Sequence, residues 1–466
     1  MGAVPAPISA CDTLYQELDQ ATEQAGVRDG GERSISGFSY LRVNRLLASL
    51  TPPVTEEKKF DAWTGRLAAR DLNAREIELH NLARTDATQV LQRLRECSTE
   101  KLVRDRANPE RRAQLIEAAH VPADYSNAAR FFGLYPLAVP FLRAGISKYN
   151  AQVRTDFAQP LRELPHGGKL ILWRPDSVST PKPTEVARWL QQRDVLGMPQ
   201  LTAAQWQRLA AAHAPSWWVE TEGDYDLPGA PVWRGQHPAL DTSQPVTYFL
   251  PSYGRWQGRV VPQLVYIVWF AARPPAASLD FYAGQFDGLV WRVTLDETGQ
   301  ALAYDTIHPC GCYHYYFPVA DLKVKVKDSL WEEPVLVPQV NAPAKEVAVR
   351  VESATHYVRR VVPDYAAFSA ERRQYTLRPY RELLSLPRSD GTRRSLFRPN
   401  GLLCGSERLE RLWLWPSGVI SPGAMRQWGR HATAFIGTRH FDDPEVLERV
   451  FAPASPHSSL SHGERR

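Results

Sequence analysis

The sequence contains no run of 18 or more apolar residues, and its longest apolar segment, Leu264 to Ala272, has the length of a buried strand. It contains neither a Gly-x-x-x-x-Gly-Lys phosphate loop nor the Gly-x-Ser-x-Gly motif of a serine hydrolase. No segment repeats along the chain. These absences argue against a transmembrane helix, a P-loop nucleotide site and a repeat architecture.

An excess of one charge is also nearly lacking. The 56 Lys and Arg residues are balanced by 51 Asp and Glu, and the net charge is only +5 over 466 residues. Such a weak and dispersed positive charge predicts no nucleic-acid partner. The chain is long enough for two or three domains, and its 37 prolines and 14 tryptophans indicate long connections and aromatic packing.

Cysteine is scarce, but two of the five cysteines lie in the single stretch Asp305 to His314, together with two histidines. If Ala301 to His314 forms a strand, four potential metal ligands at alternate positions share one face. Gly311 lies between the cysteines and permits the bend that would bring the outer two together. These predicted ligands are His308, Cys310, Cys312 and His314. Thiolates and imidazoles favour zinc or iron.

The same stretch supports other interpretations. Cys310 and Cys312 could form a short disulfide, or one of them could pair with Cys97 or Cys404. Both could be small buried residues. In a thiol enzyme, either cysteine would be the nucleophile, with His308 or His314 as the base. Asp305 could orient one of these histidines if the chain bends.

Ile8-Ser9-Ala10-Cys11 resembles the lipobox of bacterial lipoproteins, in which the cysteine receives a lipid after cleavage. Met1 to Pro7 lacks the basic and apolar residues of a signal peptide, so a complete signal would lie upstream. The resemblance implies a lipid on Cys11 that contacts the membrane surface, and Asp12 implies retention on the periplasmic side of the inner membrane. If the resemblance is accidental, we expect a cytoplasmic protein.

A secondary acidic site is predicted where four carboxylates alternate after Trp217 and Trp218. These are Glu220, Glu222, Asp224 and Asp226. On one strand face they would raise a pKa or attract a hard cation. Gly223, Pro228 and Gly229 favour the alternative of an exposed acidic loop, since charge runs are usually solvated.

Hydrophobic periodicity and turn residues divide the chain into six segments. We expect a possible signal-peptide remnant (1–10), a helical domain (11–157), a connection with helices (158–215), a β-rich domain (216–400), a C-terminal α-helical segment (401–452) and a disordered tail (453–466). The helical domain includes a helix opened by Asn108 and Pro109, and the C-terminal segment a helix starting after Ser421-Pro422.

The sequence therefore predicts an α+β fold in which the C-terminal helical segment packs on a mixed or antiparallel sheet. The first functional hypothesis is a bacterial envelope protein, lipid-anchored or not, with a transition-metal site that is structural or hydrolytic. The second is a non-catalytic envelope binding or assembly protein stabilised by disulfides. The third is a thiol enzyme. The protein partners are not specified by the sequence.

Overall fold

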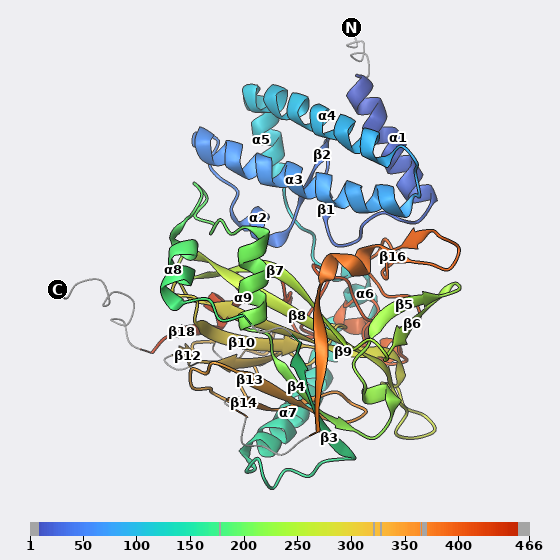
Figure 1. Cartoon of the computed structure of the whole chain (residues 1–466), viewed down its shortest axis with the longest axis vertical. Coiled ribbons are helices and arrows are strands. Elements are labelled where there is room, and N and C mark those ends of the chain that lie inside the picture. The colour runs from blue at the N-terminus through green and yellow to red at the C-terminus, as the bar shows by residue number, and fades with distance from the viewer. Residues whose placement is uncertain are drawn as a thin grey trace, which may run out of the picture.

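The computed structural model describes residues 9–176, 179–319, 322–326, 329–363, 365 and 371–454. Most of the predicted signal-peptide remnant and nearly all of the predicted tail lie outside this part of the chain. The described residues form an α+β fold with 34% helix and 29% strand, in which a layer of helices lies at one end of a large curled sheet (Figure 1). The predicted fold class is confirmed.

The N-terminal layer contains five helices in the described residues and a small hairpin. The elements are α1 (Ala10–Gln24), α2 (Arg45–Ser49), α3 (Glu57–Asn81), α4 (Ala87–Ala107), α5 (Pro109–Ala118), β1 (Arg33–Ile35) and β2 (Phe38–Val43). Asn108 caps α5 through its side-chain oxygen and Pro109 follows it, as expected. Tyr15, Trp63 and Leu94 are fully buried in the core of this layer.

Ten strands of the described chain form the main sheet. In order they are β11 (Tyr315–Pro318), β10 (Ala301–Ile307), β9 (Gly284–Leu295), β8 (Arg259–Arg273), β7 (Val246–Trp256), β15 (Glu371–Pro379), β3 (Lys169–Pro175), β4 (Ser216–Thr221), β13 (Val347–Val351) and β14 (Val358–Pro363). Pairing is antiparallel from β11 to β7, and β15 joins β7 and β3 in parallel. The sheet is therefore mixed.

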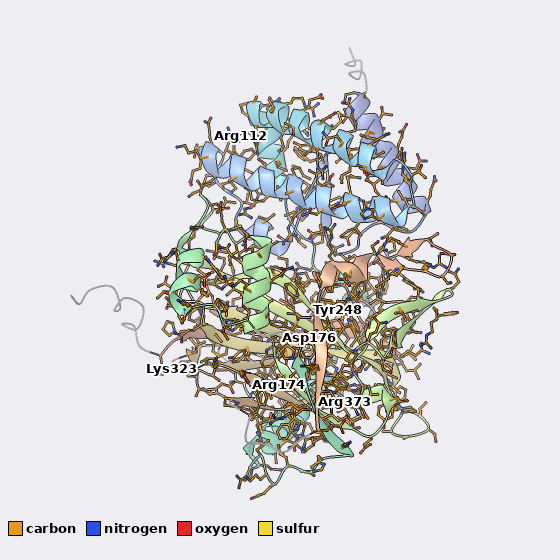
Figure 2. All side chains as sticks on the ribbon, viewed as in Figure 1. Arg112, Arg174, Asp176, Tyr248, Lys323 and Arg373 are labelled. Carbon is orange, nitrogen blue, oxygen red and sulfur yellow. A yellow bond between two sulfur atoms is a disulfide. The ribbon has the colours of Figure 1, made fainter. Side chains whose placement is uncertain are left out.

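Alternation along the strands gives the sheet two different buried faces. Tyr266 and Trp291 are paired across β8 and β9 and face one core, whereas Ile267 and Val290, the next pair, face the other. Two helices outside the N-terminal layer, α8 (Pro183–Gln191) and α9 (Ala203–Ala212), contribute to the first core. The side chains fill the space between the elements in Figure 2, where Arg174 of β3 and Arg373 of β15 are labelled.

The segment predicted as one helical domain is divided in the structure. The helices α6 (Asn127–Phe132) and α7 (Tyr135–Ala158) lie with the sheet and not with the N-terminal layer (Figure 1). Val153 and Phe157 of α7 belong to the first sheet core, which explains the division. A periodic pattern identifies a helix but does not say which core it packs against.

The C-terminal segment has little helix. It contains the short α10 (Arg411–Leu414), the 3₁₀ turn η4 (Trp415–Ser417) and α11 (Val446–Val450), which precedes β18 (Phe451–Pro453). The helix expected after Ser421-Pro422 is wrong. Gly423 and Gly429 have positive φ, and the Arg426 N–H donates to the carbonyl of Pro309, so this segment runs as turns beside the β10–β11 turn.

The remaining described elements are short. They are the 3₁₀ turns η1 (Asp224–Asp226) and η3 (Tyr380–Leu384) and the strands β5 (Ala230–Arg234), β6 (His237–Asp241), β12 (Leu322–Val324), β16 (Leu386–Pro387) and β17 (Arg393–Arg394). Within the described residues, every helix is too short or too polar to cross a bilayer.

Candidate functional site

The predicted Cys/His stretch forms the turn between β10 and β11 and is not a continuous strand. β10 ends at Ile307, and the His308 N–H donates to the carbonyl of Cys312 across the turn. Gly311 has φ +93°, and a Cβ there would lie 2.1 Å from the carbonyl oxygen of Ala432. The predicted bend at Gly311 is therefore present, but the four ligands do not share one strand face.

His314 is fully engaged on one face of the sheet. Its Nε2 lies 2.9 Å from Asp305, and its Nδ1 lies 3.2 Å from the hydroxyl of Tyr316. Asp305 forms a buried ion pair with Arg292, which outweighs the effect of burial and lowers the pKa of this carboxyl. The carboxylate therefore accepts from Nε2–H, and Nδ1 accepts from Tyr316. Burial lowers the pKa of His314 to about 4, so the ring is neutral.

His308 contacts a different carboxylate, on the opposite face. Its Nδ1 lies 3.1 Å from Asp287 of β9, and the ring contacts those of Tyr313 and Tyr357. Burial lowers the pKa of His308, which is therefore neutral. Since Nδ1–H donates to Asp287, Nε2 carries the lone pair, and this buried atom has no hydrogen-bond partner among the described residues.

Asp287 also links His308 to a second histidine. His356, in the β13–β14 turn, has its Nδ1 3.0 Å from Asp287 and its Nε2 3.3 Å from Asp226. Burial disfavours the charged ring, but the two carboxylates outweigh it and raise the pKa of His356. Four buried side chains therefore contact one another in sequence, which we call the Asp–His chain. Their order is Asp226, His356, Asp287 and His308.

The charges of the Asp–His chain are balanced. Arg408 lies 3.4 Å from Asp287, and together with His308 it outweighs burial and holds the pKa of Asp287 well below its usual range. Two carboxylates thus face one guanidinium and one imidazolium. Balanced ion pairs of this kind make buried charge tolerable. The Nε2 atom of His308 faces no carboxylate, unlike Nε2 of His356, and is therefore available for proton transfer or metal binding.

The two thiols of the turn lie close together, and the thiol of Cys312 is protonated. The Cys312 N–H donates to the sulfur of Cys310 at 3.4 Å. A hydrogen bond with Cys310 and burial raise the pKa of Cys312 well above its ordinary value. Nucleophilic cysteines need a lowered pKa, so this environment disfavours a reactive thiolate at Cys312. Both cysteines are free, as is Cys404.

The structure does not bring the four predicted metal ligands together. His308 and His314 bind separate carboxylates on opposite faces of the sheet. Across the described ranges, no group of three or more His, Cys, Asp or Glu side chains is arranged to hold a metal ion. The predicted contact of Asp305 with one of the histidines is present, at His314. Zinc or iron binding stays a prediction.

The predicted acidic residues are also separated, because β4 ends at Thr221. Glu220 is buried and paired with Arg350, and Asp226 is buried in the Asp–His chain. Glu222 and Asp224 are exposed. The expectation of four carboxylates on one strand face is therefore wrong, and the exposed-loop interpretation holds for the middle two.

Cys11 forms a disulfide with Cys97 of α4, so Cys97 is not the partner of Cys310 or Cys312. Ser9 caps α1 by accepting from the Asp12 N–H, and Asp12 pairs with Lys101. Ser-Ala-Cys-Asp therefore has a local structural role as the start of a helix. A sulfur in a disulfide cannot also carry a thioether-linked lipid, so the disulfide and the predicted lipidation are alternatives.

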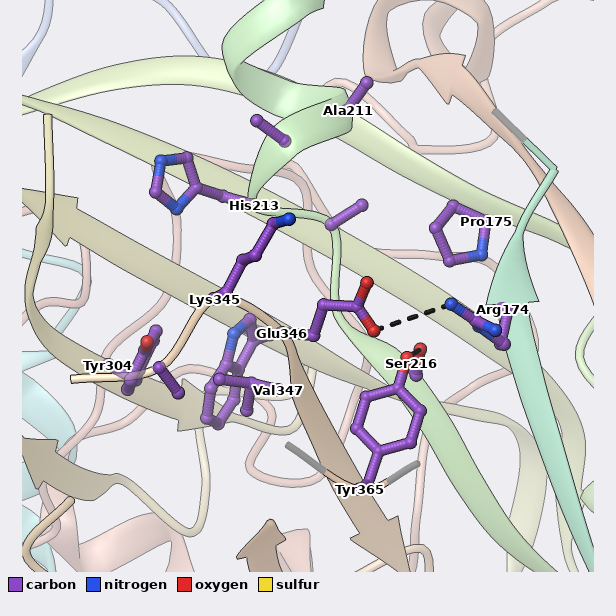
Figure 3. Close-up of a pocket in the computed structure, with 14 residues that line it drawn as sticks. Arg174, Pro175, Ala211, His213, Ser216, Tyr304, Lys345, Glu346, Val347 and Tyr365 are labelled. Carbon is purple, nitrogen blue, oxygen red and sulfur yellow. Dashed lines mark hydrogen bonds and ion pairs between the residues drawn. The ribbon is translucent and has the colours of Figure 1, made fainter. Parts of the chain in front are cut away.

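Two cavities in the described residues differ in size. The smaller is about 30 Å³ and is lined by Arg174, His213, Ser216, Glu346 and Tyr365 among others (Figure 3). Ser216 and Tyr365 share a hydrogen bond, and Arg174 pairs with Glu346. This volume holds about one water molecule.

The larger cavity is about 220 Å³ and lies between the N-terminal layer and the sheet. We call it the interlayer cavity. Its ionisable lining residues are Asp29, Glu32, Arg70 and Asp442, and its aromatic lining residues are Tyr253, Tyr380 and Trp428. Pockets between two bodies are frequent ligand sites. No pattern in the sequence predicted it, because its walls come from distant segments.

Asp287, His356 and Arg408 were likewise not identified from the sequence. Each lies far along the chain from the others and in no recognisable motif. No protein-family model, curated protein or solved structure matches the chain. Its function must therefore be argued from these side chains alone.

Proposed function

We propose that the protein is a non-catalytic binding protein of the bacterial cell envelope that holds a small amine-bearing ligand in the interlayer cavity. The observation that carries the proposal is the lining of this cavity. Three carboxylates, Asp29, Glu32 and Asp442, line the cavity with one cation, Arg70, and Asp442 is paired with Arg45 behind the lining, which leaves two carboxylates for one cation. A ligand with a positive charge would restore the balance.

The carboxylates differ in how well they are satisfied. One oxygen of Glu32 accepts from Arg70, whereas the other is buried without a partner in the described structure. Burial raises the pKa of Glu32 despite Arg70, and it raises the pKa of Asp442 despite Arg45. Asp29 accepts from Gln427 and from the Glu32 N–H. The partner-free oxygen of Glu32 is the natural acceptor for an ammonium group.

Size narrows the class of ligand. A cavity of about 150 Å³ holds benzene, so 220 Å³ has room for one substituted six-membered ring. Trp428 and Tyr253 provide aromatic surface for such a ring or for a cation. An amino sugar or a short aliphatic amine fits both the size and the charge.

The envelope location rests on the Cys11–Cys97 disulfide, because disulfides persist in oxidising compartments. The lipid-anchored form remains an alternative in which Cys11 carries a lipid and Cys97 is a free thiol. Intact mass of protein made with an upstream signal peptide separates the two. A mass increased by a diacylglyceryl group would contradict the disulfide form.

The experiment on the cavity measures thermal stabilisation by glucosamine, ethanolamine and spermidine at about 10 mM, with glucose as the neutral control. We expect at least one amine to raise Tm and glucose to have no effect. Glu32→Gln should weaken the binding of that amine at least tenfold, whereas Glu222→Gln in the exposed acidic loop should leave its binding unchanged. No shift with any amine, or an equal shift with glucose, would contradict the proposal.

One observation supports a second candidate function, a zinc or iron site at the β10–β11 turn. The Nε2 atom of His308 is buried, carries a lone pair and has no partner in the described structure. With Cys310 and Cys312 two and four residues away in the chain, a rearranged turn would offer zinc or iron one imidazole and two thiolates. Thiol deprotonation would have to accompany metal binding.

A further inference from the structure

A group of large apolar side chains is exposed beside the sheet. On α6 and the start of α7, Phe131 and Phe132 are each 76% exposed and Phe141 is 81% exposed. On α10 and η4, Trp413 is 60% and Trp415 41% exposed. Leu134, Leu137, Leu412 and Ile420 extend the same surface. We call this set the aromatic face. Single exposed apolar residues are ordinary, but a contiguous group marks an interaction site.

The two parts of the aromatic face are joined directly. The Ser126 N–H, which precedes α6, donates to the carbonyl of Gly418 at 2.7 Å. Arg130 of α6 donates through Nε to the carbonyl of Ser417 at the end of η4. Trp413 packs edge-to-face on Phe281, with ring centroids 4.7 Å apart, and keeps its other side in solvent. The residues therefore form one surface on a fixed backbone.

The two segments that carry the aromatic face contain cations but no carboxylate. The chain has no Asp or Glu between Asp124 and Asp156, or between Glu410 and Asp442, and these two segments contain the whole face. They contain the exposed cations Lys148, Arg154 and Arg411. The acidic residues at its border are Glu332, next to the exposed Trp331, and Asp280, next to Phe281.

We propose that the aromatic face binds the surface of a membrane that contains anionic phospholipid. Phe, Leu and Trp side chains of this kind enter the boundary between headgroups and acyl chains, where an amphipathic Trp is favoured. The exposed Lys and Arg residues of the same two segments are attracted to anionic headgroups. A bilayer is favoured over a protein partner because the two segments that carry the apolar residues contain cations and no carboxylate, a composition typical of interfacial helices.

This inference is independent of the proposed ligand and of a lipid on Cys11. The interlayer cavity is lined by other residues, and Cys11 lies on α1 in the N-terminal layer, whereas α6 and α7 lie with the sheet (Figure 1). The protein is tested as the 466-residue chain made in the cytosol, so that no lipid is attached. Loss of amine binding and loss of membrane binding are then separate results.

The experiment is co-sedimentation with vesicles of phosphatidylcholine alone or mixed with phosphatidylglycerol. We expect binding to the mixed vesicles, at least tenfold weaker binding to phosphatidylcholine, and weakening by added salt. Phe132→Ser combined with Phe141→Ser should reduce binding to the mixed vesicles at least tenfold. Val103→Ser is the matched control, because Val103 is 65% exposed on α4, away from the aromatic face.

Three results would overturn the proposal. They are absence of binding to the mixed vesicles, equal binding by the double variant, and a dimer in solution that the double variant abolishes. The last result would mean that a second copy of the chain covers the face. Because both phenylalanines are exposed, the double variant should fold, and its circular dichroism spectrum and Tm check this.

Discussion

The N-terminal layer and the sheet body bury charge in different ways. In the layer, Arg42 of β2 is 1% exposed and bonds Asp71 and Glu78 of α3, and Arg75 of α3 bonds the same Asp71. In the sheet body, the Asp–His chain buries two carboxylates with two histidines and Arg408. Guanidinium groups stay charged at every physiological pH, whereas histidines titrate near neutrality.

Sulfur shows the same contrast. The layer contains the Cys11–Cys97 disulfide, and the sheet body contains the free thiols of Cys310, Cys312 and Cys404. The layer should therefore respond to a reductant but little to mild acid. The sheet body should respond to acid but little to a reductant. The comparison shows that the chemistry of the buried groups decides which solution conditions destabilise a region. The disulfide makes the layer sensitive to reductant while its arginines stay charged in mild acid, and histidines make the sheet body sensitive to acid.

The largest expected effect comes from breaking the ion network of the layer. Arg42→Leu leaves Glu78 buried without its guanidinium and leaves Asp71 with Arg75 alone, and we expect a loss of about 3–5 kcal/mol in the free energy of unfolding. Urea denaturation measures it. Arg95→Leu, on an exposed position of α4, should change the same quantity by less than about 0.5 kcal/mol. Equal effects would mean that the network is not stabilising.

Loss of the disulfide tests the proposed response to reductant. The bond links residues 86 apart, and closing a loop of that size contributes about 4 kcal/mol. We expect Cys11→Ala with Cys97→Ala to lower stability by about this amount. Hydrogen exchange followed by mass spectrometry should show faster exchange in α1 and α4 and unchanged exchange in β8 and β9. Faster exchange in both regions would mean that the N-terminal layer and the sheet body do not differ in their dependence on the disulfide.

Acid should destabilise the sheet body. The pKa of His314 is lowered to about 4, so this ring is neutral when folded and takes a proton in the unfolded chain below about pH 6.5. Stability is then lost as pH falls from 6.5 to 4, by roughly 3 kcal/mol at most for this residue. Burial also lowers the pKa values of four other histidines, which should add to the loss of stability in acid. They are His213, His308, His431 and His440.

His356 opposes this trend, because its pKa is raised. The stabilisation that protonated His356 gives to the folded state is fully present below the pKa of about 6.5 that histidine has in the unfolded chain. It is lost as the pH rises through the pKa of His356 in the folded state. We expect the neutral histidines to outweigh it. The measurement is the urea midpoint at pH 7, 5.5 and 4. His314→Gln should flatten the fall with acid, and an unchanged fall would remove His314 as its cause.

The smallest effect on stability is expected at the turn thiols. Cys310→Ser keeps the size and a weak hydrogen-bonding group and should cost about 1–2 kcal/mol. Titration of the unfolded, unreduced protein should find three thiols per chain, because two of the five cysteines form the disulfide. One thiol would mean that Cys310 and Cys312 are oxidised together.

The second candidate function is checked on the same sample. About one zinc or iron per chain, lost in both Cys310→Ser and His308→Ala, would support a metal-holding arrangement of the turn. His314→Gln is the matched control, because both nitrogens of His314 already have partners. Metal lost equally in the control would indicate a different ligand set.

Local sequence signals predicted several elements well. Asn108 and Pro109 open α5 as expected, and Gly311 provides the expected bend between Cys310 and Cys312. Both depend on residues within a few positions of each other, so their physical causes are visible in the sequence. The helix expected after Pro422 failed because that backbone is bound to the β10–β11 turn, which lies more than a hundred residues away.

The sequence by itself determined the α+β class, the helix caps, the alternating strands and the bend at Gly311, because these follow from local sterics and from periods of two and 3.6 residues. Only the tertiary structure decided that His308 binds Asp287 and His314 binds Asp305, that Cys97 pairs with Cys11, and that a cavity lies between the N-terminal helices and the sheet. Those contacts depend on which distant segments meet when the chain folds. Burial and charge neutralisation decide which of the possible contacts are stable.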